Sequence, residues 1–411
     1  MFLLAGVSVR ALMESAAASG YKARGIDFFG DLDALRHGHT IKLKDLGREQ
    51  TVKSLLEAAK EIPCAGLVYS SGPENTPDEL EFWEKRGLLR GNERSVLRKV
   101  RDPWELKRCL ESNGHRMPPF LSVDEWKESA REGKWLLKAL NRGSCHGIIE
   151  LPENLDSAPD YLMELNRFSP YIVQRYIEGV SASATFLANG REALVVGTSR
   201  QLINRGGGLF YYKGNIVPLE IGESMDYEHL ISKINDLAGC LTLCFGLKGV
   251  NTVDFILNSE GVWVLEVNPR WSASVELIER YLGKSLFDEH LRACAGGGLP
   301  RFSEAVPEVL GGAAFNARYV GKRLVLAEKT MVTGLMEEKG FQYLYERGIR
   351  DIPRSATTIE EGQPICTVLA GGSTDRGCER RLNEKSQIVS QFCSRYYSPG
   401  LQEQKEGDVD D

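Results

Sequence analysis

The stretch GVNTVDFILNSEGVWVLEVNPRW, residues 249–271, decides the fold of this 411-residue chain. Two runs of strand-forming residues flank a turn, which predicts a β-hairpin with a three-residue loop, 259–261, that ends in a glycine. A loop of this length places Asp254 directly opposite Glu266. Side chains two apart share one face of a strand, so Asn268 lies beside Glu266. The predicted hairpin therefore carries two carboxylates and an amide on one face.

This acidic face predicts a metal site. Two opposed carboxylates destabilise a strand pair by up to about 1 kcal/mol unless a positive charge lies between them. Carboxylate and amide oxygens suit a hard cation such as Mg²⁺ or Mn²⁺, and Mg²⁺ leaves positions for substrate phosphates. Arg270, just past the strand, offers a planar donor fork to a phosphate or carboxylate. A solvated hairpin face with incidental acids is the simpler alternative on these residues alone.

The composition is that of an ordinary globular protein, with 42% hydrophobic and 26% charged residues. No apolar run approaches the roughly 18 residues needed to cross a membrane. The net charge of -6 gives no electrostatic basis for nucleic-acid binding. The N-terminal run MFLLAGV predicts a buried strand rather than a signal peptide. We therefore expect a cytoplasmic protein without membrane or nucleic-acid partners.

The nine cysteines are an odd number and contain no C-x-x-C pair, which argues against a disulfide framework or a structural zinc site. Cys240 and Cys244 share one face of a predicted helix, 226–245. We expect both to be small buried hydrophobic residues.

The N-terminal segment, residues 1–94, alternates strand and helix signals and predicts a Rossmann-like parallel sheet. The turn after its first strand reads GVSVRA, so the dinucleotide fingerprint is absent. Ligands of open α/β sheets bind at strand carboxyl ends. We therefore expect the residues that select the substrate to lie near Ser8, Arg10 and Asp27 and near residues 204–212. For Arg10, a surface charge at the start of a helix is the simpler alternative.

The fold class is therefore α/β and α+β multidomain. We expect a small C-terminal β-rich domain at 301–400 and an acidic tail at 401–411.

Four motifs of the core, in this order, resemble those of the ATP-grasp superfamily, the fold of biotin carboxylase and the D-alanine ligases. They are KWLLKAL with the loop NRGSCHGI, then VQRYIEG, then VDFIL, then VLEVNPR. The resemblance covers about residues 95–300. It implies a two-lobed ATP-grasp core there, with its small lobe at about 130–180, and a Rossmann-like domain before this core.

The resemblance implies a role for each motif. Lys138 becomes a lysine that binds the ATP phosphates, and Gly143, Ser144 and Gly147 belong to a loop that closes over them. For Lys138 a solvated surface charge is the simpler alternative. Asp254, Glu266 and Asn268 become ligands of the magnesium ions, and Arg270 joins Lys138 as a catalytic residue. The strand and hinge that would hold adenine and ribose contain Gln174, Arg175, Tyr176, Ile177 and Glu178.

One departure from the family concerns a second ATP lysine. Relatives often place it at the start of the helix where this chain reads VRDPWELKRCL, with Pro103 near the expected position. Lys99, Arg101 and Lys107 are the candidates to replace it.

The reaction that the resemblance implies is an ATP- and magnesium-dependent ligation. A small-molecule carboxylate attacks the γ-phosphate, and an amine or other nucleophile displaces phosphate from the resulting acylphosphate. One alternative is a biotin-carboxylase-like carboligase, because TTIEEGQPICTVLAGG resembles the small β domain of that enzyme. Another is a protein that binds ATP without turnover. The partners are then the acid and the nucleophile, with a homodimer as a possible assembly.

Overall fold

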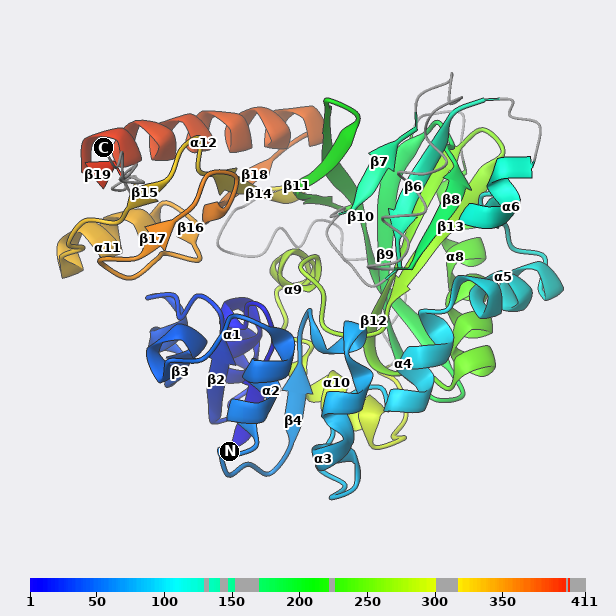
Figure 1. Ribbon diagram of the computed structural model, residues 1–411, viewed down its shortest axis with the longest axis horizontal. Coiled ribbons are helices and arrows are strands. Elements are labelled where there is room, and N and C mark those ends of the chain that lie inside the picture. The colour runs from blue at the N-terminus through cyan, green and yellow to red at the C-terminus, as the bar shows by residue number, and fades with distance from the viewer. Residues whose placement is uncertain are drawn as a thin grey trace, which may run out of the picture.

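The computed structural model describes residues 1–128, 133–140, 147–151, 170–221, 226–300, 317–396 and 398–399. Figure 1 shows the N-terminal segment at the bottom, a large sheet at the upper right and the C-terminal segment at the upper left. Within these ranges no helix combines the length and the apolar character needed to cross a membrane.

The first domain is the predicted parallel sheet, with strand order β3-β2-β1-β4. Leu3 and Leu4 of β1 belong to two different hydrophobic cores, so this strand is buried on both faces, as is usual for a parallel sheet. The elements are β1 (Phe2–Ala5), α1 (Arg10–Ala18), β2 (Ala23–Asp27), β3 (Thr40–Lys42), α2 (Val52–Ala59), β4 (Leu67–Tyr69) and α3 (Glu81–Glu84).

A second sheet dominates the molecule, and twelve strands of the described residues belong to it. Its main path runs β13-β12-β9-β10-β11-β7-β6-β8-β5. The strands of this path are β5 (Phe120–Ser122), β6 (Trp135–Ala139), β7 (Ile148–Glu150), β8 (Tyr171–Arg175), β9 (Val180–Asn189), β10 (Ala193–Gly206), β11 (Leu209–Val217), β12 (Lys248–Asn258) and β13 (Gly261–Asn268).

The region contains two separate hydrophobic cores, while its predicted domain bounds stay a prediction. Val123, Trp126 and Leu137 belong to the core of the small lobe, under strands β5 to β8. The larger core fills the space between β9, β12 and the helices beside them. The helices of the region are α4 (Arg94–Val100), α5 (Pro103–Ser112), α6 (Val123–Glu128), α8 (Tyr227–Phe245), α9 (Val275–Leu282) and α10 (Phe287–Cys294).

The C-terminal segment continues the large sheet, because β14 pairs with β11 on one side and with β18 on the other. It also contains a helix of 22 residues, α12, which the sequence analysis did not predict. This helix lies along β14 and β18 (Figure 1). The elements are β14 (Tyr319–Leu326), β15 (Met331–Val332), α11 (Glu338–Glu346), β16 (Ile349–Arg350), β17 (Thr358–Ile359), β18 (Pro364–Gly372), α12 (Asp375–Tyr396) and β19 (Ser398–Pro399).

Arg10 is neither a surface charge at the start of a helix nor a lining residue of the cavity described below. Its guanidinium is buried and donates to Glu276 of α9 at 2.5 Å and to Asp351 after β16 at 2.8 Å. Asp27 is likewise engaged, since its carboxylate accepts from the backbone N–H groups of Val9 and Gly30. Both residues join segments of the fold and do not line the cavity described below.

The expectation of no disulfide was wrong for one pair of cysteines. Cys109 of α5 and Cys244 of α8 form a disulfide, and Cys244 is exposed rather than buried. The sequence spacing gave no signal because the two residues lie 135 positions apart.

Candidate functional site

The hairpin of β12 and β13 places Asp254 opposite Glu266, as predicted, but for a different reason. The loop has two residues rather than three, because Asn258 pairs with Gly261. A β-bulge at Leu265 then shifts the register by one residue and restores the predicted pairing at the acidic face.

Glu266 is held by two cations. The Nζ atom of Lys138, on β6, lies 2.9 Å from Glu266 Oε2, and Nη1 of Arg101 lies 3.9 Å from the same oxygen. Burial alone would raise the pKa of Glu266, but the charges of Lys138 and Arg101 outweigh it and lower the pKa to about 2. Glu266 is therefore ionised, and Lys138 does not have the simpler role of a solvated surface charge.

Asp254 has the opposite electrostatic situation. Burial and the charge of Glu266 raise its pKa to about 7, against weaker opposing effects of Arg270 and Lys138. The two carboxylates thus favour a proton or an additional cation between them. This behaviour fits a divalent cation, which would supply the missing positive charge.

Arg270 connects this face to the N-terminal domain. Its Nε donates to Glu74 at 2.8 Å, and its Nη2 donates to the amide oxygen of Asn268 at 3.0 Å. The amide nitrogen of Asn268 donates to Asp254 at 2.9 Å. A carbonyl oxygen has two lone pairs, so the amide oxygen of Asn268 can accept the hydrogen bond from Arg270 and coordinate a metal ion at the same time. Its role as a metal ligand stays a prediction.

These side chains line one cavity of about 540 Å³. The predicted site residues that line it are Lys138, Gln174, Arg175, Tyr176, Ile177, Asp254, Glu266, Asn268 and Arg270. Glu178 and Gly147 are not among its lining residues. Gly143 and Ser144 lie outside the described residues.

Of the candidates to replace the second ATP lysine, Arg101 reaches the site. Its Nη2 also donates to the backbone oxygen of Leu140 at the end of the β6 segment, at 3.2 Å. Lys99 is exposed, and Lys107 lies near Glu111 and the ring of Phe120. The geometry therefore favours Arg101.

The cavity continues beyond Arg270 into residues that the sequence analysis missed. Thr252, Ser272 and Ser274 form a row of hydroxyls joined at 2.7 and 2.9 Å. Arg200 and Arg323 line the same end. Arg200 is paired with Asp375 at 2.7 Å, whereas no described carboxylate lies within 4.0 Å of Arg323. The expected 204–212 region also contributes to the lining of the cavity through Phe210 and Tyr212, and the ring of Phe210 lies beside that of Tyr176.

Glu74 is the other residue that the sequence did not reveal. It follows a turn after β4, far in the sequence from Arg270, and nothing in the pattern SGPENTP marks it as part of a site. For Ser272 and Ser274 the sequence offers a weak signal of a role in the site. They follow Arg270 closely, and residues next to a functional arginine lie close to the ligand that it binds.

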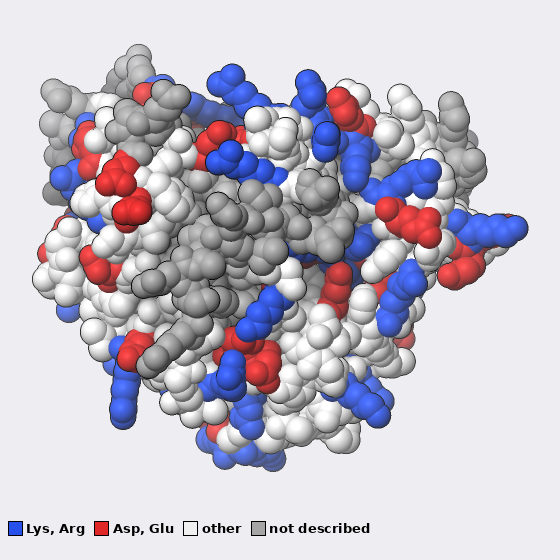
Figure 2. Space-filling view, turned by 180° about the vertical axis from the view of Figure 1, so that it is seen from behind, with Lys and Arg blue, Asp and Glu red and all other residues white. Residues whose placement is uncertain are grey.

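Figure 2 shows one face of the molecule, on which positive and negative side chains of the described residues are interspersed. The cavity itself is lined by both cationic and acidic side chains, among them Lys138, Asp254 and Arg270.

Comparison with known proteins relates part of this chain to a known family. Residues 100–274 match the family model of the ATP-grasp domain. An uncharacterized protein of Methanocaldococcus jannaschii is 22% identical over 90% of this chain and 87% of its own length. The carbamoyl phosphate synthase large chain of Thermoplasma acidophilum is 23% identical over 57% of this chain, which covers only 23% of that protein.

Solved structures show the same fold over nearly the whole chain. L-amino acid ligase from Bacillus licheniformis has a TM-score of 0.66 at 15% identity, covering 94% of this chain and 97% of its own. Biotin carboxylase from Campylobacter jejuni has a TM-score of 0.68 at 14% identity, covering 95% of this chain and 90% of its own.

Proposed function

Because its residues 100–274 form an ATP-grasp domain, the chain belongs to the ATP-grasp superfamily, and we propose that it is an ATP- and Mg²⁺-dependent ligase. It would activate a small-molecule carboxylate as an acylphosphate, which an amine or another nucleophile then attacks. The observation that carries this proposal is the single cavity that brings together Lys138, Asp254, Glu266 and Arg270. The predicted homodimer and cytoplasmic location remain predictions.

The residues divide the work along the cavity. Strand β8 and the hinge after it, residues 174–177, would hold the base, and Lys138 would move from Glu266 to the phosphates once a metal ion neutralises that carboxylate. Asp254, Glu266 and Asn268 would hold Mg²⁺, which neutralises charge that develops on the phosphates.

Arg270 lies at the junction between the acidic face and the row of hydroxyls. Its guanidinium would hold the transferred phosphoryl group or the attacking carboxylate in line. The far end, with Thr252, Ser272 and Arg323, would bind the rest of the acid. No side chain needs to act as a nucleophile, because positioning and charge neutralisation supply most of the catalysis.

The test is a screen of small carboxylic acids, bicarbonate included, for ADP formation by the full chain with Mg²⁺ and ATP, with and without amines and thiols. We expect acid-dependent ADP release that is lost in both Glu266→Gln and Lys138→Ala. Activity that survives both changes would refute the site. MgADP binding without turnover of any acid would instead support a nucleotide-binding protein.

A further inference from the structure

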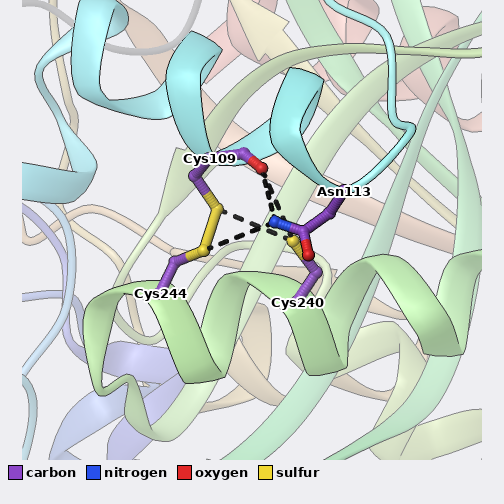
Figure 3. The surroundings of a disulfide bond; sticks show 4 residues. All are labelled: Cys109, Asn113, Cys240 and Cys244. Carbon is purple, nitrogen blue, oxygen red and sulfur yellow. Dashed lines mark hydrogen bonds between the residues drawn. A yellow bond between two sulfur atoms is a disulfide. The ribbon is translucent and has the colours of Figure 1, made fainter.

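Three cysteines gather between helices α5 and α8 (Figure 3), and none of them lines the cavity. Cys109 comes from α5, and Cys240 and Cys244 lie one turn apart on α8. Cys109 and Cys244 form the disulfide, and Cys240 Sγ lies 3.6 Å from Cys109 Sγ. We call these three residues the thiol cluster.

The thiol cluster is unusual within the chain. All three sulfurs lie within 4.8 Å of one another. Among the described residues, no other group of three His, Cys, Asp or Glu side chains brings its ligand atoms so close. Cys240 Sγ is not part of the disulfide, so a covalent bond between the two helices does not explain why a third sulfur lies beside it.

We infer that the reduced protein binds one zinc-type divalent ion through the thiolates of Cys109, Cys240 and Cys244. Tetrahedral zinc with sulfur ligands at about 2.3 Å places those sulfurs about 3.8 Å apart. The 3.6 Å between Cys109 and Cys240 already matches this spacing. Thiolates select zinc over the hard cations that suit the Asp254–Glu266 face.

The disulfide must be reduced before all three sulfurs can bind an ion. Reduction of the Cys109–Cys244 bond leaves three thiols and takes two electrons and two protons. A thiol reductant supplies both and becomes a disulfide, whereas a phosphine supplies the electrons and becomes its oxide, with water giving the oxygen and the protons. Binding of the ion then releases the three thiol protons. The fourth position of the ion is left for water.

The surroundings allow an ion to enter and to be held. Cys244 is exposed, whereas Cys109 is buried at 9% relative exposure, so the ion can approach from the α8 side. Asn113 donates to the backbone oxygen of Cys109 at 2.8 Å and fixes the end of α5 beside the thiol cluster (Figure 3). A bound ion would join α5 to α8 in the reduced protein, where the disulfide does so in the oxidised protein.

The experiment uses the full chain in two redox states. Protein reduced with a phosphine is titrated with Zn²⁺ against a chromophoric chelator in excess Mg²⁺, and Co²⁺ serves as the spectroscopic probe. We expect one Zn²⁺ per reduced chain, thiolate-to-cobalt charge-transfer bands, and no binding at this site in the oxidised chain. No zinc binding by the reduced chain, or equal binding by both states, would overturn the inference.

Two variants separate the thiol cluster from other thiols. Cys240→Ser should weaken zinc binding at least about tenfold, the loss that even an outer partner of a metal ligand can cause. Cys64→Ser removes a free half-buried thiol of the N-terminal domain and should leave binding unchanged. Thermal unfolding of the metal-free variants checks their folding. Equal zinc affinity in Cys240→Ser and wild type would contradict the proposed ligand set.

Discussion

Glu74, in the turn after β4, accepts a hydrogen bond of 2.8 Å from Nε of Arg270, at the end of β13. The two side chains are 3% and 9% exposed, so this is a buried ion pair between the N-terminal domain and the ATP-grasp domain. The other carboxylate oxygen of Glu74 accepts from the backbone N–H of Gly72 at 2.6 Å, which fixes its orientation. The N-terminal domain thereby orients an arginine of the cavity.

Glu74→Ala should destabilise the protein and impair its site. Removing one partner of a buried ion pair leaves the other charge uncompensated, at a cost of about 3–5 kcal/mol in the free energy of unfolding. Chemical denaturation measures this loss. Glu81→Ala is the control, because Glu81 is half exposed and its ion pairs with Lys85 and Arg94 lie at the surface, where the loss of a partner has little effect on stability. Similar losses in both variants would contradict the proposed importance of the pair.

Lys138→Ala should weaken the binding of MgADP. A hydrogen bond to a charged group contributes about 1.5–3 kcal/mol, so we expect the dissociation constant to rise roughly 10- to 100-fold. Isothermal titration calorimetry gives this value directly. Lys134→Ala, an exposed lysine just before the same strand, should bind as wild type does. The assignment of Lys138 fails if both variants bind equally well.

Asp254→Asn should stabilise the metal-free protein and abolish its response to Mg²⁺. The folded-state pKa of Asp254 is about 7, well above its ordinary value of 3.8. Between about pH 4 and 7 the unfolded chain has released this proton while the folded chain keeps it, so wild-type stability falls as pH rises. The advantage of the variant should therefore grow through this window and level off above it.

The size of this effect at pH 8 should be on the order of 4 kcal/mol, since the shift is about three pKa units and each unit corresponds to about 1.4 kcal/mol. Denaturation curves from pH 4 to 8, with and without Mg²⁺, measure it. Saturating Mg²⁺ should stabilise the wild type only. A variant that gains as much from Mg²⁺ as the wild type would exclude Asp254 as a ligand.

Two glycine substitutions should change stability in opposite directions. A Cβ on Gly179, beside the cavity, would lie 2.6 Å from the backbone oxygen of Leu257, so Gly179→Ala should cost about 1–3 kcal/mol. A Cβ on Gly239, in α8, meets nothing within 4 Å, so Gly239→Ala should add about 0.5–1 kcal/mol. Thermal unfolding distinguishes the two. A stabilised Gly179→Ala would show that the backbone there can move.

The acidic face could be predicted from sequence because residue types and strand alternation determine which side chains share a face. Asp254, Glu266 and Asn268 were found in this way. The loop length was wrong, and the bulge at Leu265 compensated for it. A bulge leaves little signal in one sequence, since it depends on how the strand fits its neighbours.

Other features could not be predicted because they depend on contacts between distant segments. Glu74 meets Arg270 across 196 positions, and Arg10 meets Asp351 across 341. The 22 residues of α12 have a predominantly polar sequence, and their helix is stabilised by packing on β14 and β18. Local periodicity contains no information on such partners.

The pairing of β14 with β11 determines how the chain can be divided. Residues Gly214–Val217 of β11 hydrogen-bond to Val320–Arg323 of β14. A fragment ending at residue 300 would therefore expose an unpaired sheet edge beside the cavity, and such edges recruit other chains. The ATP-grasp region therefore cannot be expressed without β14 and keep this edge paired. During synthesis, the large sheet can be completed only after the ribosome has released β14 and β18. Fusions or truncations engineered at residue 300 should therefore aggregate.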